Sequence, residues 1–205
     1  HVLVGTNTQD LNKGNVISNA SCTTNAVGPV AAVMSENPGI EKAMLTTVHG
    51  YTASQNLVDG PSEKPARGRA AAQNIVLTTT GAAEATAKAM PELEGLFTGV
   101  ALRVPVSAGS VIDFTFLAKR DTSVEEINEI FVKASEEERW KGILEVTCEP
   151  LVSSDILKTT AGAIVDLNHT RVVGGNLVKV FAWYDNEWGY SAMLLREVKE
   201  IGKLI

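Results

Sequence analysis

The 205-residue sequence has only two cysteines, Cys22 and Cys148, and they lie far apart in the chain. Two thiols do not make the disulfide framework that stabilises many small secreted proteins, so we expect both to stay reduced. A reducing cytoplasm fits such a chain best. The start, His1 to Gly5, also lacks the charged region and the long apolar region of a signal peptide.

Long hydrophobic runs and basic clusters are missing as well. No apolar run approaches the roughly 20 residues that a membrane-spanning helix needs. The net charge is −6, and no run of lysine and arginine is longer than a pair. Both features argue against a nucleic acid or an anionic membrane as the main partner. The hydrophobic content of 44% is enough for the core of a globular protein.

One polar stretch, Ser18 to Asn25, follows a short apolar run and precedes a segment of helical length, rich in alanine and valine. Ser21 is a good helix N-cap, which predicts a helix from about Thr23 to Ser35 with Cys22 in its first turn. The unpaired N–H groups and the positive dipole end there favour an anion, so we expect the pKa of Cys22 to be lowered. The alternative is a small buried cysteine at the start of a core helix.

His49 ends a predicted strand over 40–49, just before a long polar loop over 53–69. A histidine remote in sequence can activate a cysteine, although a packed histidine is the commoner case. Arg103 interrupts an apolar run, so its charge needs a partner or an anion in a cleft. Thr80-Gly81 at a predicted helix start could bind phosphate or could simply cap the helix.

Arg67 in the long loop could pair with an anion or lie in solvent. The cysteines and histidines lack the spacing of metal ligands, so we predict no metal site. His169 is expected at the surface, and Cys148 is expected to be an ordinary buried thiol.

The periodicity of the rest of the chain predicts an α+β fold with a mixed, mostly antiparallel sheet. A capping box at Thr122 to Glu125 predicts an amphipathic helix to about Trp140. A helix that begins at Thr80 is expected to reach about Met90, and a last helix is expected over 188–204. The predicted strands are 1–4, 15–18, 40–49, 95–106, 110–119, 144–149, 163–167 and 177–184.

Several ordered motifs together resemble the phosphorylating glyceraldehyde-3-phosphate dehydrogenase family, over almost the whole chain. They are SNASCTTN at 18–25, TTVHGYT at 46–52, RAAAQNIV at 69–76, TTTGAA at 78–83, ALRVP at 101–105 and WYDNEWGYS at 183–191.

The resemblance implies that Cys22 attacks the aldehyde of glyceraldehyde 3-phosphate and that His49 activates the thiol. A hydride then goes to NAD or NADP, and inorganic phosphate cleaves the thioacyl enzyme. It implies substrate-phosphate contacts from Thr52 and Arg103, and an inorganic-phosphate site at Ser21, Thr23, Thr80 and Gly81 with Arg67 near both. It also implies nicotinamide contacts from Asn186 and Tyr190.

The same resemblance implies a domain layout and an assembly. Residues 1–22 would be the final strands of a truncated NAD-binding Rossmann domain, and 23–184 the catalytic domain with helices packed on one face of its sheet. The helix over 185–205 would pack back on the NAD-binding domain. The loop 53–69 would mediate a homotetramer, and the chain's start at His1 suggests a missing N-terminal part.

The chain departs from the usual family pattern at Ser54, at Ala66 and in the turn 106–110. These departures bear on phosphate geometry and subunit contacts. Alternatives are a dehydrogenase of another phosphorylated aldehyde such as erythrose 4-phosphate, a non-catalytic interaction module, and a thiol hydrolase or acyl transferase.

Overall fold

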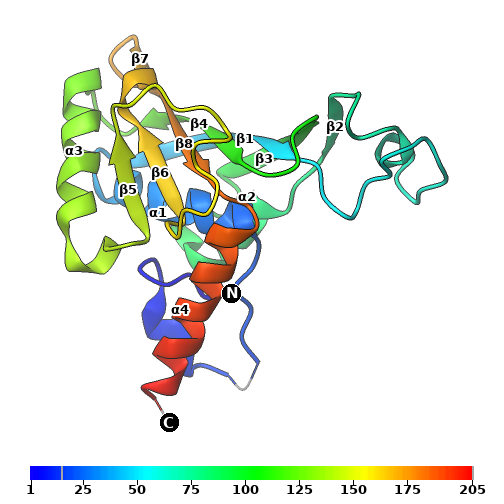
Figure 1. Cartoon of the computed structure of the whole chain (residues 1–205). Coiled ribbons are helices and arrows are strands. Elements are labelled where there is room, and N and C mark those ends of the chain that lie inside the picture. Colours follow the sequence, from blue (N-terminus) through cyan, green and yellow to red (C-terminus); the bar gives the residue numbers. More distant parts are fainter. Residues whose placement is uncertain (15, 205) are drawn as a thin grey trace.

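The computed structural model describes residues 1–14 and 16–204. These residues form four α-helices and one eight-stranded sheet, joined by loops and short 3-10 turns (Figure 1). The helices are α1 (Cys22–Glu36), α2 (Ala82–Ala89), α3 (Val124–Glu136) and α4 (Trp188–Gly202). The strands are β1 (Ile40–Gly50), β2 (Val76–Thr79), β3 (Phe97–Val104), β4 (Ser110–Ala118), β5 (Leu144–Thr147), β6 (Ala163–Asp166), β7 (Arg171–Val173) and β8 (Leu177–Tyr184).

The sheet is mixed and mostly antiparallel, which confirms the predicted fold class. Its strand order is β2-β3-β1-β4-β8-β6-β5, and β7 pairs with β8 as a short hairpin. The pairs β1–β3 and β5–β6 are parallel, and the remaining pairs are antiparallel. Strands β3 and β4 are consecutive in the sequence, yet β1 lies between them and pairs with both.

Helices cover one face of the sheet. The alternation in β4 is regular: Ser110, Ile112, Phe114, Phe116 and Ala118 are buried, and the residues between them are partly exposed. Helix α1 contacts β1, β4, β6 and β8, while α2 lies on β3 and α3 on β5. The period of two therefore places the core between the sheet and these three helices.

Helix α1 is the centre of this core. Every residue from Thr23 to Met34 is buried, and most of them are small. Ser21 caps the helix by accepting a hydrogen bond from the Thr24 N–H, as predicted. A methyl group on Gly28 would lie 2.7 Å from Leu3 Cδ1, so the N-terminal segment packs directly against the helix.

The two predicted N-terminal strands are wrong. Among the described residues, 1–4 and 16–18 form no strand, and Asn15 lies outside the described residues. The chain turns at once because the Leu3 carbonyl accepts from Thr6 and Asn7 N–H groups, while the Asn7 side chain accepts from Leu3 N–H. Local side-chain bonding of this kind competes with strand pairing.

Two predicted helix starts need correction. The N-cap of α2 is Gly81, not Thr80, although the Thr80 hydroxyl accepts a hydrogen bond from Ala82 N–H. The N-cap of α3 is Ser123, which accepts from Glu126 N–H, so the capping residue lies one position later than expected. Helix α3 also ends at Glu136, and a separate 3-10 turn carries the chain to Trp140.

The loop 53–69 belongs to an arm that projects from the sheet (Figure 1). A 3-10 turn at Pro65–Gly68 is its only regular element among the described residues. The arm is closed by its own bonds, from Asn56 N–H to the Arg67 carbonyl and from Gly60 N–H to the Gly68 carbonyl. These internal bonds close the arm on itself, and Lys64 and Arg67 also donate to Thr79 and Thr78 of β2, which attach the arm to the edge of the sheet.

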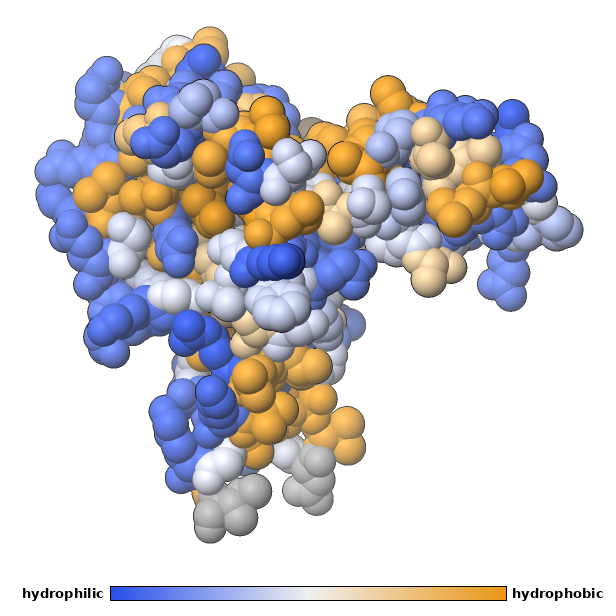
Figure 2. Space-filling model, in the orientation of Figure 1, coloured by the Kyte–Doolittle hydropathy of each residue, from blue (hydrophilic) through white to orange (hydrophobic). Residues whose placement is uncertain are grey.

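Helix α4 and the N-terminal segment form a second projection, at the bottom of Figure 1. Leu194, Leu195 and Val198 on α4 are 41%, 54% and 55% exposed, and Figure 2 shows apolar residues on this projection. No helix within the described residues is long and apolar enough to cross a membrane.

Candidate functional site

The parallel pairing of β1 and β3 places two of the predicted site residues side by side. His49 and Arg103 are register partners, and both strands end within one residue of them. His49 lies on the face that the helices cover, because Leu45 and Thr47 before it at intervals of two are buried there. The site therefore lies at the carboxyl end of this parallel pair.

The start of α1 meets His49 at this edge. Cys22 is the first residue of the helix, and its Sγ lies 3.4 Å from His49 Nε2. Cys22 is partly buried, and His49 is 3% exposed. A thiol and an imidazole nitrogen in hydrogen-bond contact form a nucleophile and base pair that can transfer one proton.

Tyr184, at the end of β8, contacts the two elements that carry Cys22 and His49. It was not predicted as a site residue. Its hydroxyl is hydrogen-bonded to Thr23 Oγ1 at 2.9 Å and to Thr47 Oγ1 at 2.7 Å, so it links α1 to β1. Its ring lies edge-on to the His49 ring, with centroids 5.9 Å apart. Burial raises the pKa of Tyr184, which keeps the hydroxyl protonated. A buried tyrosine at the end of an alternating strand is a signal that could have found it.

The electrostatics of Cys22 differ from the prediction. Burial raises the pKa of the thiol above its ordinary value, and this effect outweighs the hydrogen bonds from Thr23 and the charge of Arg103, which lower it. The expectation of a lowered pKa from the helix start is therefore wrong, because removal from water is the larger effect. Cys22 is a neutral thiol at neutral pH.

His49 is also neutral. Burial, followed by the charge of Arg103, lowers its pKa to about 4. The two groups thus form a neutral pair, in which a basic nitrogen stands ready to accept the thiol proton.

The Nδ1 atom of His49 faces two polar neighbours. It lies 2.6 Å from the Gly50 carbonyl oxygen and 2.7 Å from Arg103 Nη1. Arg103 Nη1 also donates to the Gly50 carbonyl at 2.9 Å.

Two guanidinium groups converge beside this pair. Arg103 lies close to Arg67, and burial and the charge of Arg67 both lower the pKa of Arg103. Arg103 Nε is buried without a hydrogen-bond partner among the described residues. Within the same residues, neither arginine forms a salt bridge to a carboxylate. Two neighbouring cations with spare donors favour an anion between them.

A chain of side chains holds Arg67 at the base of the arm. Its Nε donates to Thr78 Oγ1 at 3.0 Å, and its Nη1 donates to Ser54 Oγ at 3.2 Å. Ser54 Oγ is in turn 2.9 Å from Thr52 Oγ1. Thr52, predicted as a phosphate contact, therefore belongs to the same cluster as Arg67. Ser54, one of the departures from the family pattern, joins the two.

The remaining predicted phosphate residues are less tightly grouped. The Ser21 hydroxyl caps α1, and Thr23 is buried against Tyr184. Thr80 and Gly81 follow β2 at the start of α2, a helix that contacts α1. Among the described residues, no hydrogen bond joins Thr80 or Gly81 to the Cys22–His49 pair.

Asn186 is buried and is bonded mainly within the chain. Its Oδ1 accepts from the Gly109 N–H at 3.1 Å and from Ser110 Oγ at 2.9 Å, and its Nδ2 donates to Glu187 at 3.2 Å. An amide nitrogen has two hydrogens, so one donor remains for a ligand.

Tyr190 lies in the first turn of α4. Its hydroxyl donates weakly to the Ala20 carbonyl, at 3.5 Å.

A buried network supports the turn before α1. In the orientation that satisfies its neighbours, the Asn19 amide donates from Nδ2 to Glu197 Oε2 at 2.9 Å and to Asn25 Oδ1 at 3.3 Å. Ala20, the next residue, has φ +54°, a left-handed conformation that costs about 1–2 kcal/mol for a residue other than glycine. Burial raises the pKa of Glu197. Sequence reasoning missed this network, because a lone glutamate on a terminal helix looks like a surface residue.

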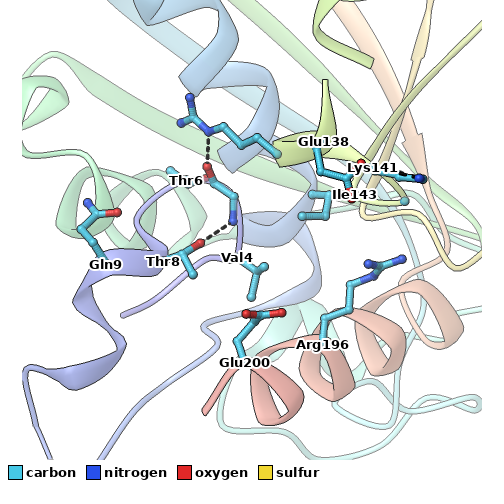
Figure 3. A pocket seen from close by; sticks show the side chains of 12 residues that line it. Val4, Thr6, Thr8, Gln9, Glu138, Lys141, Ile143, Arg196 and Glu200 are labelled. Atoms are coloured by element: carbon cyan, nitrogen blue, oxygen red, sulfur yellow. Dashed lines mark hydrogen bonds and ion pairs between the residues drawn. The ribbon is translucent and has the colours of Figure 1, made fainter. Parts of the chain in front are cut away.

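A separate cavity lies away from the Cys22–His49 pair. It has a volume of about 670 Å³ and is lined by the N-terminal segment, the turn around Gly142 and α4 (Figure 3). Figure 3 shows Arg196 and Glu200 of α4 opposite Val4 and Thr8. It contains no cysteine or histidine, so we place the chemistry at Cys22 and not here.

Other predictions concern cysteine, histidine and metals. Cys148 is exposed, so its prediction as a buried thiol is wrong: it lies just beyond β5, outside the core. The His169 side chain is 58% exposed, as predicted, and contacts Asp166. The described residues contain no group of three or more potential metal ligands.

Comparisons with known proteins identify relatives of the chain. A family model described as "Glyceraldehyde 3-phosphate dehydrogenase, C-terminal domain" matches residues 21–186. Proteins named glyceraldehyde-3-phosphate dehydrogenase are similar to the chain: 47% identical in Streptomyces coelicolor, over 95% of this chain and 58% of that protein, and 47% in Haloarcula vallismortis, over 95% and 57%. Glyceraldehyde-3-phosphate dehydrogenase 2 of Nostoc is 51% identical over 91% of this chain and 55% of its own length. The chain thus spans a little more than half of these relatives.

We predict that Cys22 reacts slowly with iodoacetamide at neutral pH, more slowly than the exposed Cys148. Its raised pKa leaves little thiolate, so the rate should keep rising into the alkaline range. The measurement is the alkylation rate of each cysteine against pH, by peptide mass spectrometry. A plateau of the Cys22 rate that begins below neutral pH would show a thiolate–imidazolium pair and contradict the neutral pair.

We also predict that acid destabilises the fold through His49. The pKa of His49 is about 4 in the folded protein against 6.5 for a solvent-exposed histidine, so the unfolded chain binds the proton more tightly between these values. The stabilisation is fully present above the unfolded pKa and is lost as the pH falls toward 4, at a cost of about 2 kcal/mol between pH 7 and 5. The measurement is urea unfolding at both pH values, with His49→Gln as the control that should lack this part of the loss. An equal loss in the control would exclude His49 as its source.

Proposed function

The chain belongs to the glyceraldehyde-3-phosphate dehydrogenase family, and we propose that it forms the catalytic part of an enzyme with that activity. The enzyme would oxidise glyceraldehyde 3-phosphate and join it to inorganic phosphate, giving 1,3-bisphosphoglycerate. The observation that carries the proposal is the Cys22–His49 contact at 3.4 Å, next to two arginines that form no salt bridge among the described residues.

In this proposal Cys22 is the nucleophile and His49 is the base. His49 Nε2 takes the thiol proton as Sγ forms a bond to the aldehyde carbon. The same nitrogen can return this proton to the aldehyde oxygen, which becomes the hydroxyl of a hemithioacetal. Oxidation would then remove a hydride from this carbon, which the nicotinamide cofactor would accept, and the hydroxyl proton, which His49 Nε2 would take; a thioester on Cys22 and a protonated His49 would remain. Inorganic phosphate then attacks the carbonyl carbon of the thioester, and the sulfur leaves and regains a proton from His49. The neutral starting pair suits this cycle, because no ion pair has to be broken before the thiol reacts.

The two arginines would hold the phosphate groups. Arg103 and Thr52 would bind the phosphate of the substrate, since Arg103 has a buried donor without a partner among the described residues. The attacking phosphate would bind where the start of α1 meets the start of α2. Arg67 lies near Arg103 and could contact either group. The residues of the attacking-phosphate site would be Ser21, Thr23, Thr80 and Gly81.

A nicotinamide cofactor, NAD or NADP, supplies the hydride acceptor when bound. Asn186 fits a role in holding it, because one hydrogen of its Nδ2 is left for a carboxamide oxygen. Tyr190, in the first turn of α4, contacts the Ala20 carbonyl two residues before Cys22, and it could line the same position.

The domain layout supports the same proposal. Residues 23–184 would form the catalytic domain, while 1–22 and 185–205 would belong to a cofactor domain whose other parts lie outside this sequence. The exposed Leu194, Leu195 and Val198 of α4 suit a helix that packs on such a domain. Free cysteines in the described residues agree with a cytoplasmic location.

We further propose a homotetramer in which the arm 53–69 contacts another subunit. Leu57 and Val58 on the arm are 62% and 79% exposed, and Figure 2 shows apolar residues on it. Met44 and Val100, on the sheet face opposite the helices, are also mostly exposed. Apolar residues gathered on a projecting arm and on an open sheet face favour burial between copies of the chain.

We expect the protein that contains this chain to reduce NAD or NADP with glyceraldehyde 3-phosphate only when inorganic phosphate is added. Cys22→Ser should lower kcat by at least ~10³-fold because the nucleophile is lost. His49→Gln should lower it by ~10²–10⁴-fold because the base is lost. Absorbance of the reduced cofactor is the measurement, and Cys148→Ser is the matched control that should keep the activity.

The same assay separates the alternatives. Faster turnover of erythrose 4-phosphate would assign another phosphorylated aldehyde as substrate. Ester hydrolysis without a nicotinamide cofactor would indicate a thiol hydrolase. Inactivity of a protein in which Cys22 and His49 are both intact would favour a non-catalytic interaction module.

For the assembly, we expect Leu57→Glu to weaken subunit association by at least about tenfold, because it places a charge in the proposed contact. Light scattering of the protein at decreasing concentration measures the mass. Val173→Glu on β7 is the matched control, since this exposed valine lies outside the arm. A tetramer that both variants leave equally stable would rule out a role for Leu57 in assembly.

A further inference from the structure

The Ser110 hydroxyl joins two parts of the candidate site. Its oxygen accepts from the Gly50 N–H at 3.2 Å, and its proton is donated to Asn186 Oδ1 at 2.9 Å. Gly50 follows His49, the proposed base, and Asn186 is the proposed contact of the cofactor. Ser110 is 2% exposed, so water does not compete for either bond.

The sheet brings Gly50, Ser110 and Asn186 together. Ser110 is the first residue of β4, whereas Gly50 is the last of β1 and Tyr184 is the last of β8. Strand β4 lies between β1 and β8, and Ser110 is the register partner of Tyr184 (Figure 1). Asn186 is the second residue after Tyr184, so the turn into α4 places its amide beside Ser110.

The direction of each hydrogen bond along this path is defined. A backbone N–H can only donate, so Ser110 Oγ accepts from Gly50 and turns its own proton toward Asn186. The Gly109 N–H also donates to Asn186 Oδ1, at 3.1 Å. Two donors therefore meet the carbonyl end of the amide, and a flipped amide would place its NH₂ group against the Gly109 N–H. The Nδ2 end faces away from them and donates to Glu187 Oε1 at 3.2 Å.

We propose that Ser110 is a positioning residue whose hydroxyl holds the Asn186 amide with Nδ2 outward, so that this part of the site takes a group that accepts a hydrogen bond and rejects one that donates. The inference rests on the proposed function, which assigns Asn186 to a nicotinamide cofactor. The accepting group is then the carboxamide oxygen of the nicotinamide, and not its NH₂ group. Ser110 acts through Asn186, because both bonds of its hydroxyl are made within the chain.

An amide held in advance binds and selects better than one that turns. Its orientation costs no conformational entropy when the ligand arrives, and a ligand with a donor at this point meets a second donor. Because Gly50 holds the Ser110 hydroxyl, the amide is also fixed relative to the strand end that carries His49. One hydroxyl thus sets the position of the cofactor contact against that of the base.

The test measures the affinity of the full-length protein that contains this chain for NADH or NADPH. Ser110→Ala removes the donor to Asn186 Oδ1, so we expect the Kd to rise about fivefold, the effect of one hydrogen bond. Fluorescence titration with the reduced cofactor is the measurement. Ser135→Ala is the matched control and should leave the Kd unchanged, because this serine donates to the Val132 carbonyl of its own helix, α3.

A double-mutant cycle separates positioning from a general loss of structure. Asn186→Ala removes the amide through which Ser110 acts, and it should raise the Kd by about tenfold or more. Ser110→Ala added to it should then change the Kd by less than about twofold. A further rise of about fivefold in the double variant would show that Ser110 acts independently of Asn186 and would overturn the proposal.

A second pair of variants isolates the hydroxyl if the alanine variant does not fold. Ser110→Thr and Ser110→Val introduce side chains of the same shape, and only threonine keeps a hydroxyl. We expect the threonine variant to bind the reduced cofactor about fivefold more tightly than the valine variant. Equal Kd values in this pair would reject a role for the hydroxyl.

Asn186→Asp tests the direction of the donor. The aspartate keeps an oxygen for Gly109 and Ser110 but replaces Nδ2 with a second acceptor. The reduced cofactor has an uncharged ring, so it gains no attraction to the new carboxylate. We expect its Kd to rise at least as far as in Asn186→Ala, and the same for the reduced 3-acetylpyridine analogue, which keeps the carbonyl oxygen and lacks the NH₂ group. An unchanged or lower Kd for NADH would mean that the ligand donates here, against the proposal.

The outcomes keep this inference apart from the proposed function. A parent protein with phosphate-dependent dehydrogenase activity, in which the two alanine substitutions act independently, would reject the inference and keep the function. A parent that lacks this activity but binds the reduced cofactor, with a non-additive cycle, would do the reverse. A parent that binds neither NADH nor NADPH would overturn both.

Discussion

The parallel pairing of β1 with β3 is the constraint on which the rest of the site depends. It places His49 beside Arg103 at the carboxyl ends of two neighbouring strands. Helix α1 packs across the same sheet, and its first residue, Cys22, meets His49 at that edge. Tyr184 then fixes the distance between helix and sheet, because its hydroxyl contacts one threonine on each. A shift of one residue in the pairing would turn His49 to the open face of the sheet.

Burial gives this edge its chemical character. Removal from water raises the pKa of Cys22 and lowers that of His49, so the nucleophile and the base start as neutral groups. The positive charge of Arg103 lowers the pKa of both groups, so it stabilises the thiolate form of Cys22 and destabilises the imidazolium form of His49. An arrangement of this kind can be reactive without a standing ion pair, because the proton has a short path from sulfur to nitrogen. The sequence suggested that the helix start lowers the pKa of Cys22, but burial, which raises this pKa, has the larger effect.

The two projections of the molecule have a different character from its core. The arm closes on itself through backbone bonds, whereas α4 and the N-terminal segment pack on α1 and leave leucine and valine side chains exposed. Both are apolar surfaces on a chain that covers little more than half of its relatives. The sheet, by contrast, has a complete core on the side that the helices cover. The site thus combines a well-packed scaffold with projections suited to further contacts.

Local patterns in the sequence determined the elements of the core. The serine before Cys22 predicted the start of α1, and the alternation of apolar residues predicted β1, β4 and β8, because helix capping and side-chain period depend on neighbouring residues only. The short strands expected at 1–4 and 16–18 failed, since an apolar run needs a partner strand and local side-chain bonds replaced it. The ordered motifs also identified Cys22 and His49 as a pair.

Only the tertiary structure decided how these residues act on one another. That β1 lies between β3 and β4, that Tyr184 joins Thr23 to Thr47, and that Glu197 is buried under Asn19 all depend on contacts between distant segments. The pKa directions of Cys22 and His49 follow from burial and from Arg103, neither of which can be read from residue order. The physical reason is the same in each case: desolvation and long-range pairing are properties of the packed molecule, whereas capping and periodicity are properties of the chain.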